Sequence, residues 1–188
     1  MLFSKGLFRR SLFAAFTSAA LLGACVHTPD FVTKHGIQVT LETFPGPTKL
    51  DLEKQLDLLM AMADQLEATG WSSQEMWRVL LRHPLSMVVV KDPWRCDGFV
   101  NQGQWCGGSF TADNTSGEIV IRDNSCLALT AFAHELTHYF RLFIDGAEDY
   151  YHEQEKGGAT FWGDGGLVRE ATWAMCTENC LGVCEEVP

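Results

Sequence analysis

Two histidines and a glutamate lie within five positions of one another, at His134, Glu135 and His138. On a helix, side chains four positions apart lie one turn apart on the same face, so the two imidazoles can bind one metal ion together. Zinc accepts imidazole nitrogens at about 2.0 to 2.1 Å, and a glutamate directly after the first histidine reaches a water on that metal. We therefore expect Zn²⁺ to bind His134 and His138, with Glu135 as the general base that passes a proton from water to a leaving amine.

The helix that must carry these side chains is indicated by apolar residues that recur every three or four positions across 124–144. At 100° per residue they share one narrow face, which predicts a helix with that face in the core. His134 and His138 fall on the opposite face, and Gly117–Arg122 predicts a strand shortly before the helix. The residues of the apolar face are Leu129, Phe132, Leu136, Phe140 and Phe143.

The pentapeptide His134-Glu135-Leu136-Thr137-His138 resembles the HExxH motif of zincin metallopeptidases. The resemblance covers about residues 119–175 and implies a strand, a helix that bears the motif and a cleft between them. In such families an edge strand aligns the substrate peptide, and Gly117–Arg122 is expected in that role. The resemblance thus implies a zinc metallopeptidase with a protein or peptide as its substrate.

The third zinc ligand is open among three residues, of which His152 is the leading one. Asp145-Gly146 is a good end for the helix, and a chain that doubles back there brings His152 to the level of the metal. The spacing of His152 is also similar to that of SprT-like metallopeptidases. The metzincin continuation is absent, because Arg141 and Ile144 stand where that subclass has its Gly and its third His.

Glu170 and then Asp149 are the alternative third ligands. The Gly-led stretch 165–171 resembles the second helix of gluzincins, in which a glutamate beside an alanine reaches the zinc. The stretch 146–150 is similar to the Gly-Thr-x-Asp-Tyr run of aspzincins, which places Asp149 at the ligand position. If His152 or Glu170 is the ligand, we expect Asp149 to contact that residue and help to orient it.

Aromatic residues near the motif have two expected roles. A tyrosine can stabilise the oxyanion that forms during amide hydrolysis, and the candidates are Tyr139, Tyr150 and Tyr151. Tryptophans can line a substrate cleft, although burial in the core is their commoner role. The tryptophans considered for the cleft are Trp94, Trp105, Trp162 and Trp173.

Residues 1–24 have the organisation of an export signal. Lys5, Arg9 and Arg10 precede an uncharged run, residues 11–24. This run has the length of the apolar region of a signal peptide and is too short for a helix that spans a bilayer. We therefore expect residues 1–24 to be a signal peptide.

The signal ends in Leu22-Gly23-Ala24-Cys25, which resembles the lipobox of bacterial lipoproteins. The resemblance implies lipidation of Cys25, a tether at 25–36 and a zincin-like metallopeptidase domain at 37–188. Val26 after the cysteine implies, by the same resemblance, an anchor in the outer membrane that faces the periplasm. We therefore expect a cell-envelope protein held at the membrane by lipid.

Composition agrees with one folded, exported domain. The chain has 188 residues, 46% of them hydrophobic and 20% charged, which excludes a disordered polymer. A formal net charge of -10 argues against binding to nucleic acid. Apart from Cys25 there are six cysteines, an even number that predicts three disulfides in an oxidising compartment, with Cys96–Cys106 as the preferred pair.

Short strands and helices before the motif predict an α+β fold, a single domain with a small sheet and an active-site helix. The expected elements are a strand at 37–41, a helix from Thr48 closed by Gly70, a helix from Ser72 or Ser73 to Arg82, a strand buried on both faces at 87–90 and a loop at 92–114. The fold and the motif together predict a hydrolase of peptide or amide bonds. Two alternatives stay open: a non-catalytic envelope lipoprotein with a vestigial or structural zinc site, and a peptidoglycan amidase or endopeptidase.

Overall fold

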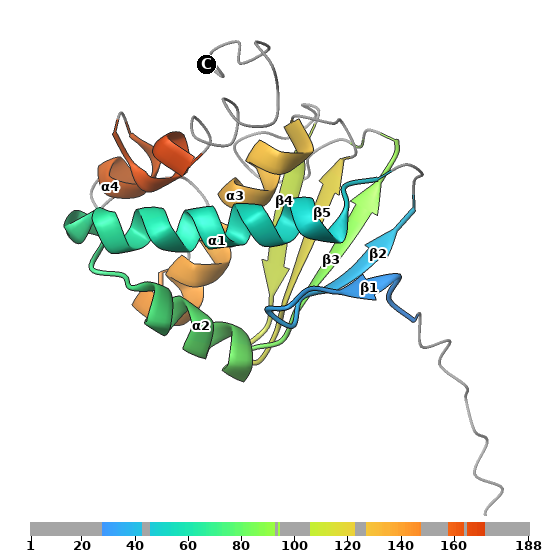
Figure 1. The fold of residues 1–188 in the computed structure, drawn as a ribbon, viewed down its shortest axis with the longest axis horizontal. Coiled ribbons are helices and arrows are strands. Elements are labelled where there is room, and N and C mark those ends of the chain that lie inside the picture. The colour runs from blue at the N-terminus through green and yellow to red at the C-terminus, as the bar shows by residue number, and fades with distance from the viewer. Residues whose placement is uncertain are drawn as a thin grey trace, which may run out of the picture.

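A mixed β-sheet with helices packed against one of its faces makes up the part of the chain that the computed structural model describes (Figure 1). That part comprises residues 28–42, 46–92, 94, 106–122, 127–147, 158–163 and 165–171. The mixture of strands and helices is consistent with the predicted α+β class. The elements are β1 (Phe31–Val32), β2 (Gln38–Leu41), α1 (Lys49–Gln65), the 3₁₀ turn η1 (Glu67–Thr69), α2 (Ser73–Arg82), β3 (Leu85–Val90), β4 (Gly108–Ala112), β5 (Gly117–Arg122), α3 (Leu127–Phe140), the π-helical turn η2 (Arg141–Asp145) and α4 (Gly158–Trp162).

The strands pair in the order β1-β2-β3-β5-β4. The three central strands β2, β3 and β5 run parallel to one another, with Val39 opposite Met87 and Met87 opposite Ile119. The outer strands β1 and β4 run antiparallel to their neighbours. Gly117–Arg122 is therefore an interior strand, and the expectation that it forms the edge of the sheet is wrong.

The strand β4 occupies the edge of the described sheet next to β5. It lies inside 92–114, where we expected only a loop, so that expectation is wrong for residues 108–112. The sequence Gly-Ser-Phe-Thr-Ala alternates polar and apolar residues only weakly, with Phe110 as its one large apolar side chain, and its residues are half-buried or exposed. Backbone pairing with β5 holds it in place, which needs no apolar pattern.

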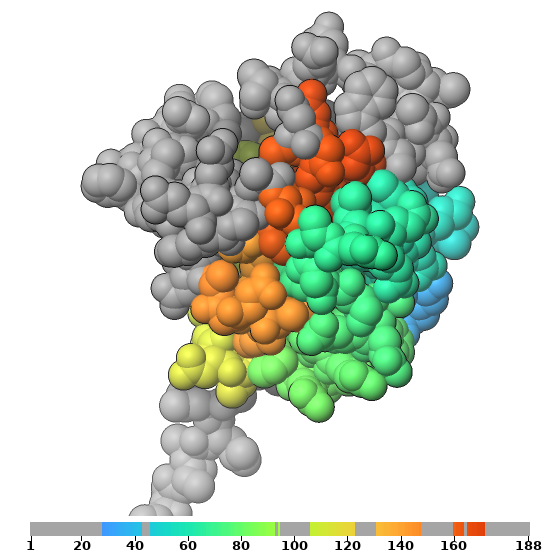
Figure 2. Space-filling view, turned by 90° about the vertical axis from the view of Figure 1, so that its left-hand side faces the viewer, coloured from blue at the N-terminus to red at the C-terminus, as the bar shows by residue number. Residues whose placement is uncertain are grey.

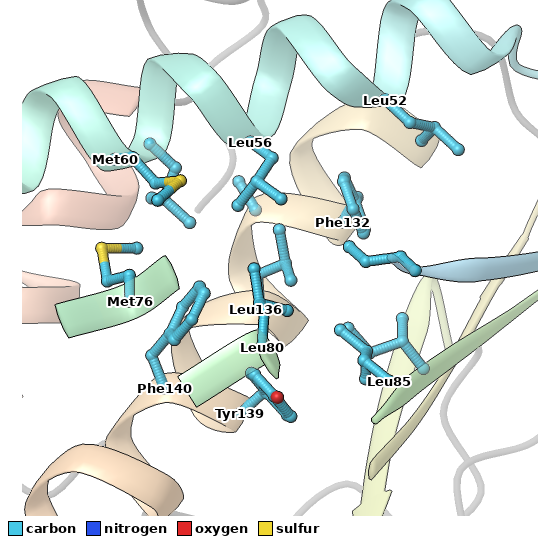
Figure 3. Packing of buried hydrophobic residues seen from close by; sticks show 14 of the residues in the cluster. Leu52, Leu56, Met60, Met76, Leu80, Leu85, Phe132, Leu136, Tyr139 and Phe140 are labelled. Carbon is cyan, nitrogen blue, oxygen red and sulfur yellow. The ribbon is translucent and has the colours of Figure 1, made fainter. Parts of the chain in front are cut away.

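The core lies between the sheet and the helices, and Figure 3 shows residues of α1, α2 and α3 meeting there. Alternate residues of β3 and β5 point into it, including Met87, Val89 and Ile119, none of which is exposed. Val88 and Val90 are only half-buried, so burial of β3 on both faces, as predicted, is incomplete. The labelled core residues in Figure 3 are Leu52, Leu56, Met60, Met76, Leu80, Leu85, Phe132, Leu136, Tyr139 and Phe140.

Both predicted helix starts before the motif are confirmed. The Asp51 N–H donates to Thr48 Oγ1 at 3.2 Å and the Thr48 N–H donates to Asp51 Oδ2 at 3.1 Å, a reciprocal cap at the start of α1. Ser72 caps α2 with a single side-chain bond, its Oγ accepting from the N–H of Glu75. Helix α1 ends at Gln65, and the turn η1 carries the chain to Gly70, whose φ of 68° suits a residue without a side chain.

The helix α3 continues into η2 and ends at Gly146, which has a φ of 67°, as the sequence predicted. The indole of Trp71 donates to Asp145 Oδ1 at 3.1 Å and ties this end to the segment before α2. On the face shown in Figure 2, the red segment that contains α4 adjoins the orange surface of α3 and η2 and the green surface of the first helices.

The predicted signal peptide and Cys25 lie outside the described residues. Within the predicted tether, Phe31 and Val32 form β1, so the sheet begins before residue 37. Across the described ranges, no helix combines the length and the apolar composition that crossing a membrane requires.

Candidate metal centre

The helix α3 presents two different faces, as its sequence predicted. Phe132, Leu136 and Phe140 are fully buried in the core. His134 and His138 are half-buried on the other side. The amphipathic pattern of the helix thus leaves the two imidazoles where a ligand can reach them while the helix itself is held by its apolar face.

The two imidazoles point toward a common position. Their Nε2 atoms are 3.2 Å apart and their ring centroids 5.0 Å apart. Two nitrogens that each lie about 2.0 to 2.1 Å from a tetrahedral zinc ion are themselves separated by about 3.3 to 3.4 Å. The observed 3.2 Å is the distance of a hydrogen bond between the two rings and is also close to the spacing of two ligands of one tetrahedral zinc ion.

Glu135, the residue that follows His134 on α3, is buried, with 7% of its surface exposed. Burial disfavours the charged carboxylate and raises the pKa of Glu135 to about 8. A cation bound nearby would favour the charged form and lower this pKa again. A carboxyl group in such a place can accept and return protons near neutral pH, as general acid–base chemistry requires.

The strand β4 makes room for this carboxyl group. A Cβ atom placed on Gly108 would lie 2.7 Å from Glu135 Oε1 and 2.9 Å from Glu135 Cγ, which is closer than side chains pack. The same construction on Gly107 meets nothing within 4 Å. Gly108 is therefore a site residue that was not predicted, since a glycine in an unrecognised strand gives no signal of its own.

An aromatic side chain from α4 packs on the histidine pair. The ring of Trp162 lies 4.6 Å, centroid to centroid, from His134 and also 4.6 Å from His138. Trp162 is one of the four tryptophans that we expected could line a cleft. Its contact with both imidazoles was not predicted, because α4 and α3 are separated along the chain.

The third ligand is not identified by the described residues. Glu170 is half-buried in the helical stretch 167–171, where its N–H donates to the carbonyl of Gly166 at 3.0 Å. In the ranges that the structure describes, no three His, Cys, Asp or Glu side chains gather as a metal site. His152 and Asp149 lie outside those ranges, as do Tyr150 and Tyr151.

Tyr139 has a different role from the one expected of it. The side chain is fully buried, and its hydroxyl donates to the carbonyl oxygen of His83. Burial also raises the pKa of this phenol above its ordinary value. Tyr139 is thus a core residue that joins α3 to the end of α2, and its proposed part in oxyanion stabilisation is wrong.

One of the expected disulfide cysteines is described. Cys106 is buried and disulfide-bonded, and its N–H donates to the carbonyl of Trp94 at 3.1 Å. Its preferred partner, Cys96, lies outside the described residues. The bond anchors the chain two residues before Gly108.

Comparison of the chain with protein-family models, curated proteins and solved structures finds no match. An account of its function must therefore start from the site itself. The arrangement offers two convergent imidazoles, a buried carboxyl group beside them and an aromatic ring packed on the pair.

Proposed function

We propose that this chain is a zinc-dependent hydrolase of the HExxH type that cleaves peptide or amide bonds. The observation that carries the proposal is the 3.2 Å separation of the His134 and His138 Nε2 atoms, which suits one tetrahedral zinc ion. The burial of Glu135 beside them adds the proton-transfer group that hydrolysis needs. A purely structural zinc site has four protein ligands and no reactive water, so it needs no carboxyl group for proton transfer.

Each residue of the site has a defined role in the proposed reaction. His134 and His138 hold the zinc together with a third ligand, His152 in first place, with Glu170 and then Asp149 as alternatives. When bound, zinc supplies a Lewis acid that polarises the scissile carbonyl and acidifies water. A carboxylate oxygen of Glu135 takes the proton of the attacking water and later returns it to the leaving amine, while Tyr150 or Tyr151 donates to the developing oxyanion.

We further propose a zincin-like arrangement in which an extended substrate lies along β4. This strand takes the part that was expected of Gly117–Arg122, because it forms the edge of the described sheet and Gly108 borders Glu135. An extended peptide can add to such an edge by main-chain hydrogen bonds. The scissile bond would then pass close to the carboxyl group.

The proposed location is the cell envelope, with lipid on Cys25 holding the protein at the outer membrane and the folded part in the periplasm. The lipobox-like end of the signal and the even number of remaining cysteines support this location. Cys25→Ser should move the protein from the membrane fraction to the soluble fraction. Retention of the variant at the membrane would contradict lipid anchoring.

The decisive experiment measures zinc content and peptide hydrolysis on the same purified full-length variants. We expect about one zinc per chain in the wild type, lost in His134→Ala and His138→Ala and in one of His152→Ala, Glu170→Ala or Asp149→Ala. His27→Ala serves as the matched control and should retain the metal. Glu135→Gln should keep zinc and lose hydrolysis, because the amide cannot accept the proton.

Each outcome decides a different part of the proposal. Equal turnover by the wild type and Glu135→Gln would overturn the role of Glu135. A folded, oxidised wild type without zinc would favour the non-catalytic lipoprotein. Hydrolysis of peptidoglycan cross-links in preference to unfolded protein would instead identify the amidase or endopeptidase.

A further inference from the structure

We infer that Trp162 is a positioning residue that fixes the orientation of both imidazole rings of the HExxH motif. The inference deepens the proposed function and rests on it, because the rings that Trp162 orients are the proposed zinc ligands. It concerns a contact between α4 and α3 that lies outside the motif itself.

The geometry places one indole against two imidazoles at once. The ring of Trp162 is tilted by 44° against His134 and by 37° against His138, at the same centroid distance of 4.6 Å from each. With the two imidazole centroids 5.0 Å apart, the three rings form a nearly equilateral cluster. These separations lie within the range in which aromatic rings attract one another.

Trp162 is itself held in place through its neighbour. Phe161 is buried, with 4% of its surface exposed, and packs on Trp71 at a centroid distance of 4.5 Å. The guanidinium of Arg141 lies 4.5 Å above the ring of Phe161. Because α4 has only five residues, it is too short to be stable alone, and these contacts of Phe161 anchor it beside α3.

The physical effect of the indole is to restrict rotation of the two rings. A histidine side chain has several rotamers and can offer either of its ring nitrogens. An indole packed on both rings leaves them less room to turn, so the Nε2 atoms stay 3.2 Å apart before a metal arrives. Groups that orient metal ligands by hydrogen bonds typically contribute about 10- to 100-fold in metal affinity, and we expect an effect of similar size from the packed indole.

The test compares three tryptophan variants of the full-length protein. Trp162→Ala should lower the zinc affinity, measured by competition with a coloured chelator, by about 10-fold or more. Trp162→Phe keeps an aromatic ring on the two imidazoles, so its zinc affinity should fall less than that of Trp162→Ala. Trp77→Ala is the matched control, because Trp77 is also half-buried and packs on a histidine, His35, at 5.3 Å, and it should keep the wild-type affinity.

A second readout does not depend on metal. In the metal-free protein, nuclear magnetic resonance of the imidazole carbon-bound protons should show shifts for both His134 and His138 in Trp162→Ala, because the ring current of the indole is lost. The same signals should be unchanged in Trp77→Ala. Unchanged signals in Trp162→Ala would overturn the contact itself.

The two proposals fail in different ways. If the wild type binds zinc and folded Trp162→Ala binds it equally well, the positioning role is wrong and the proposed function stands. If the wild type binds no zinc, the proposed function is wrong, and the resonance shifts of the two histidines decide whether Trp162 contacts both rings.

Discussion

The contact between Gly108 and Glu135 makes a strand residue responsible for the position of the proposed general base. The carboxyl oxygen occupies the space that a side chain at position 108 would need. Gly108 has no left-handed φ, so its backbone conformation would accept an alanine. The requirement for glycine here is therefore one of space beside Glu135.

Gly108→Ala should consequently displace the Glu135 carboxyl group while leaving the histidine pair in place. We expect kcat/KM for peptide hydrolysis to fall about 10- to 100-fold, because small misplacements of a catalytic group are costly, with zinc content unchanged. The measurement is steady-state hydrolysis together with metal analysis. Gly107→Ala, whose new methyl group would meet nothing within 4 Å, should keep the kcat/KM and the zinc content of the wild type. Equal activity of the two variants would contradict this account.

At the level of single residues, the sequence predicted that His134 and His138 lie together on one face of a helix, which the structure confirms. His134, Glu135 and His138 were recognised from their spacing, because the geometry of one helix brings residues four apart together. Gly108 and Trp162 were not recognised as neighbours of these residues. Their contacts join segments that are distant along the chain, and no local pattern encodes such a contact.

At the scale of elements, a buried histidine joins the turn between β1 and β2 to helix α1. His35 Nε2 lies 2.9 Å from Asp57 Oδ1, and the imidazole packs edge-on against Trp77. Burial lowers the pKa of His35 below 6.5, and the charge of Lys34 acts in the same direction, while Asp57 and Glu53 oppose it. The folded protein therefore favours the neutral imidazole.

This contact predicts how stability depends on pH. As pH falls below about 6.5, the unfolded chain binds a proton at His35 more readily than the folded chain, so the free energy of unfolding should fall. The loss amounts to about 1.4 kcal/mol for each unit by which the pKa is lowered. Urea denaturation of the metal-free protein at pH 7.5 and pH 5 measures this fall in the free energy of unfolding.

The control for this prediction is His35→Phe, which keeps a buried ring but cannot be protonated. Its free energy of unfolding should fall less between the two pH values than that of the wild type. The other histidines contribute equally in both proteins. An identical fall in the two would show that His35 is not the group responsible.

The elements themselves were predicted to different degrees. The bounds of α2 and β5 and the capping residue of α1 agree with the prediction, because caps and alternating apolar residues are local signals. The strand β4 was missed, since its place depends on pairing with β5 rather than on its own side chains. The missed strand also led to the wrong choice of edge strand.

At the scale of the whole molecule, the disulfide of Cys106 constrains the start of β4. Reduction, or the variant Cys106→Ser, should lower the free energy of unfolding by about 2 to 5 kcal/mol, because the unfolded chain regains freedom that the bond removes. Urea denaturation with and without a reductant measures the change. Cys25→Ser, at the proposed lipidation site, should leave the unfolding free energy as it is. A reductant without effect on the wild type would contradict a structural role for the bond.

By itself, the sequence determined the features whose causes lie within a few residues of one another. These are the helix with its apolar face and its histidine pair, the capped starts of α1 and α2, and the alternating strand β5. Their physical basis is the fixed geometry of helices and strands and the hydrogen bonds of a single turn. Features with such local causes can be predicted from the sequence alone.

Tertiary packing, in contrast, determines which strand borders the site and which residues surround its side chains. It placed β4 at the edge of the described sheet, Gly108 against Glu135, and Trp162 on His134 and His138. These neighbours meet because burial of the core brings separate elements together, and many sequences satisfy burial without specifying the contact. The surroundings of the site are therefore a property of the packed molecule.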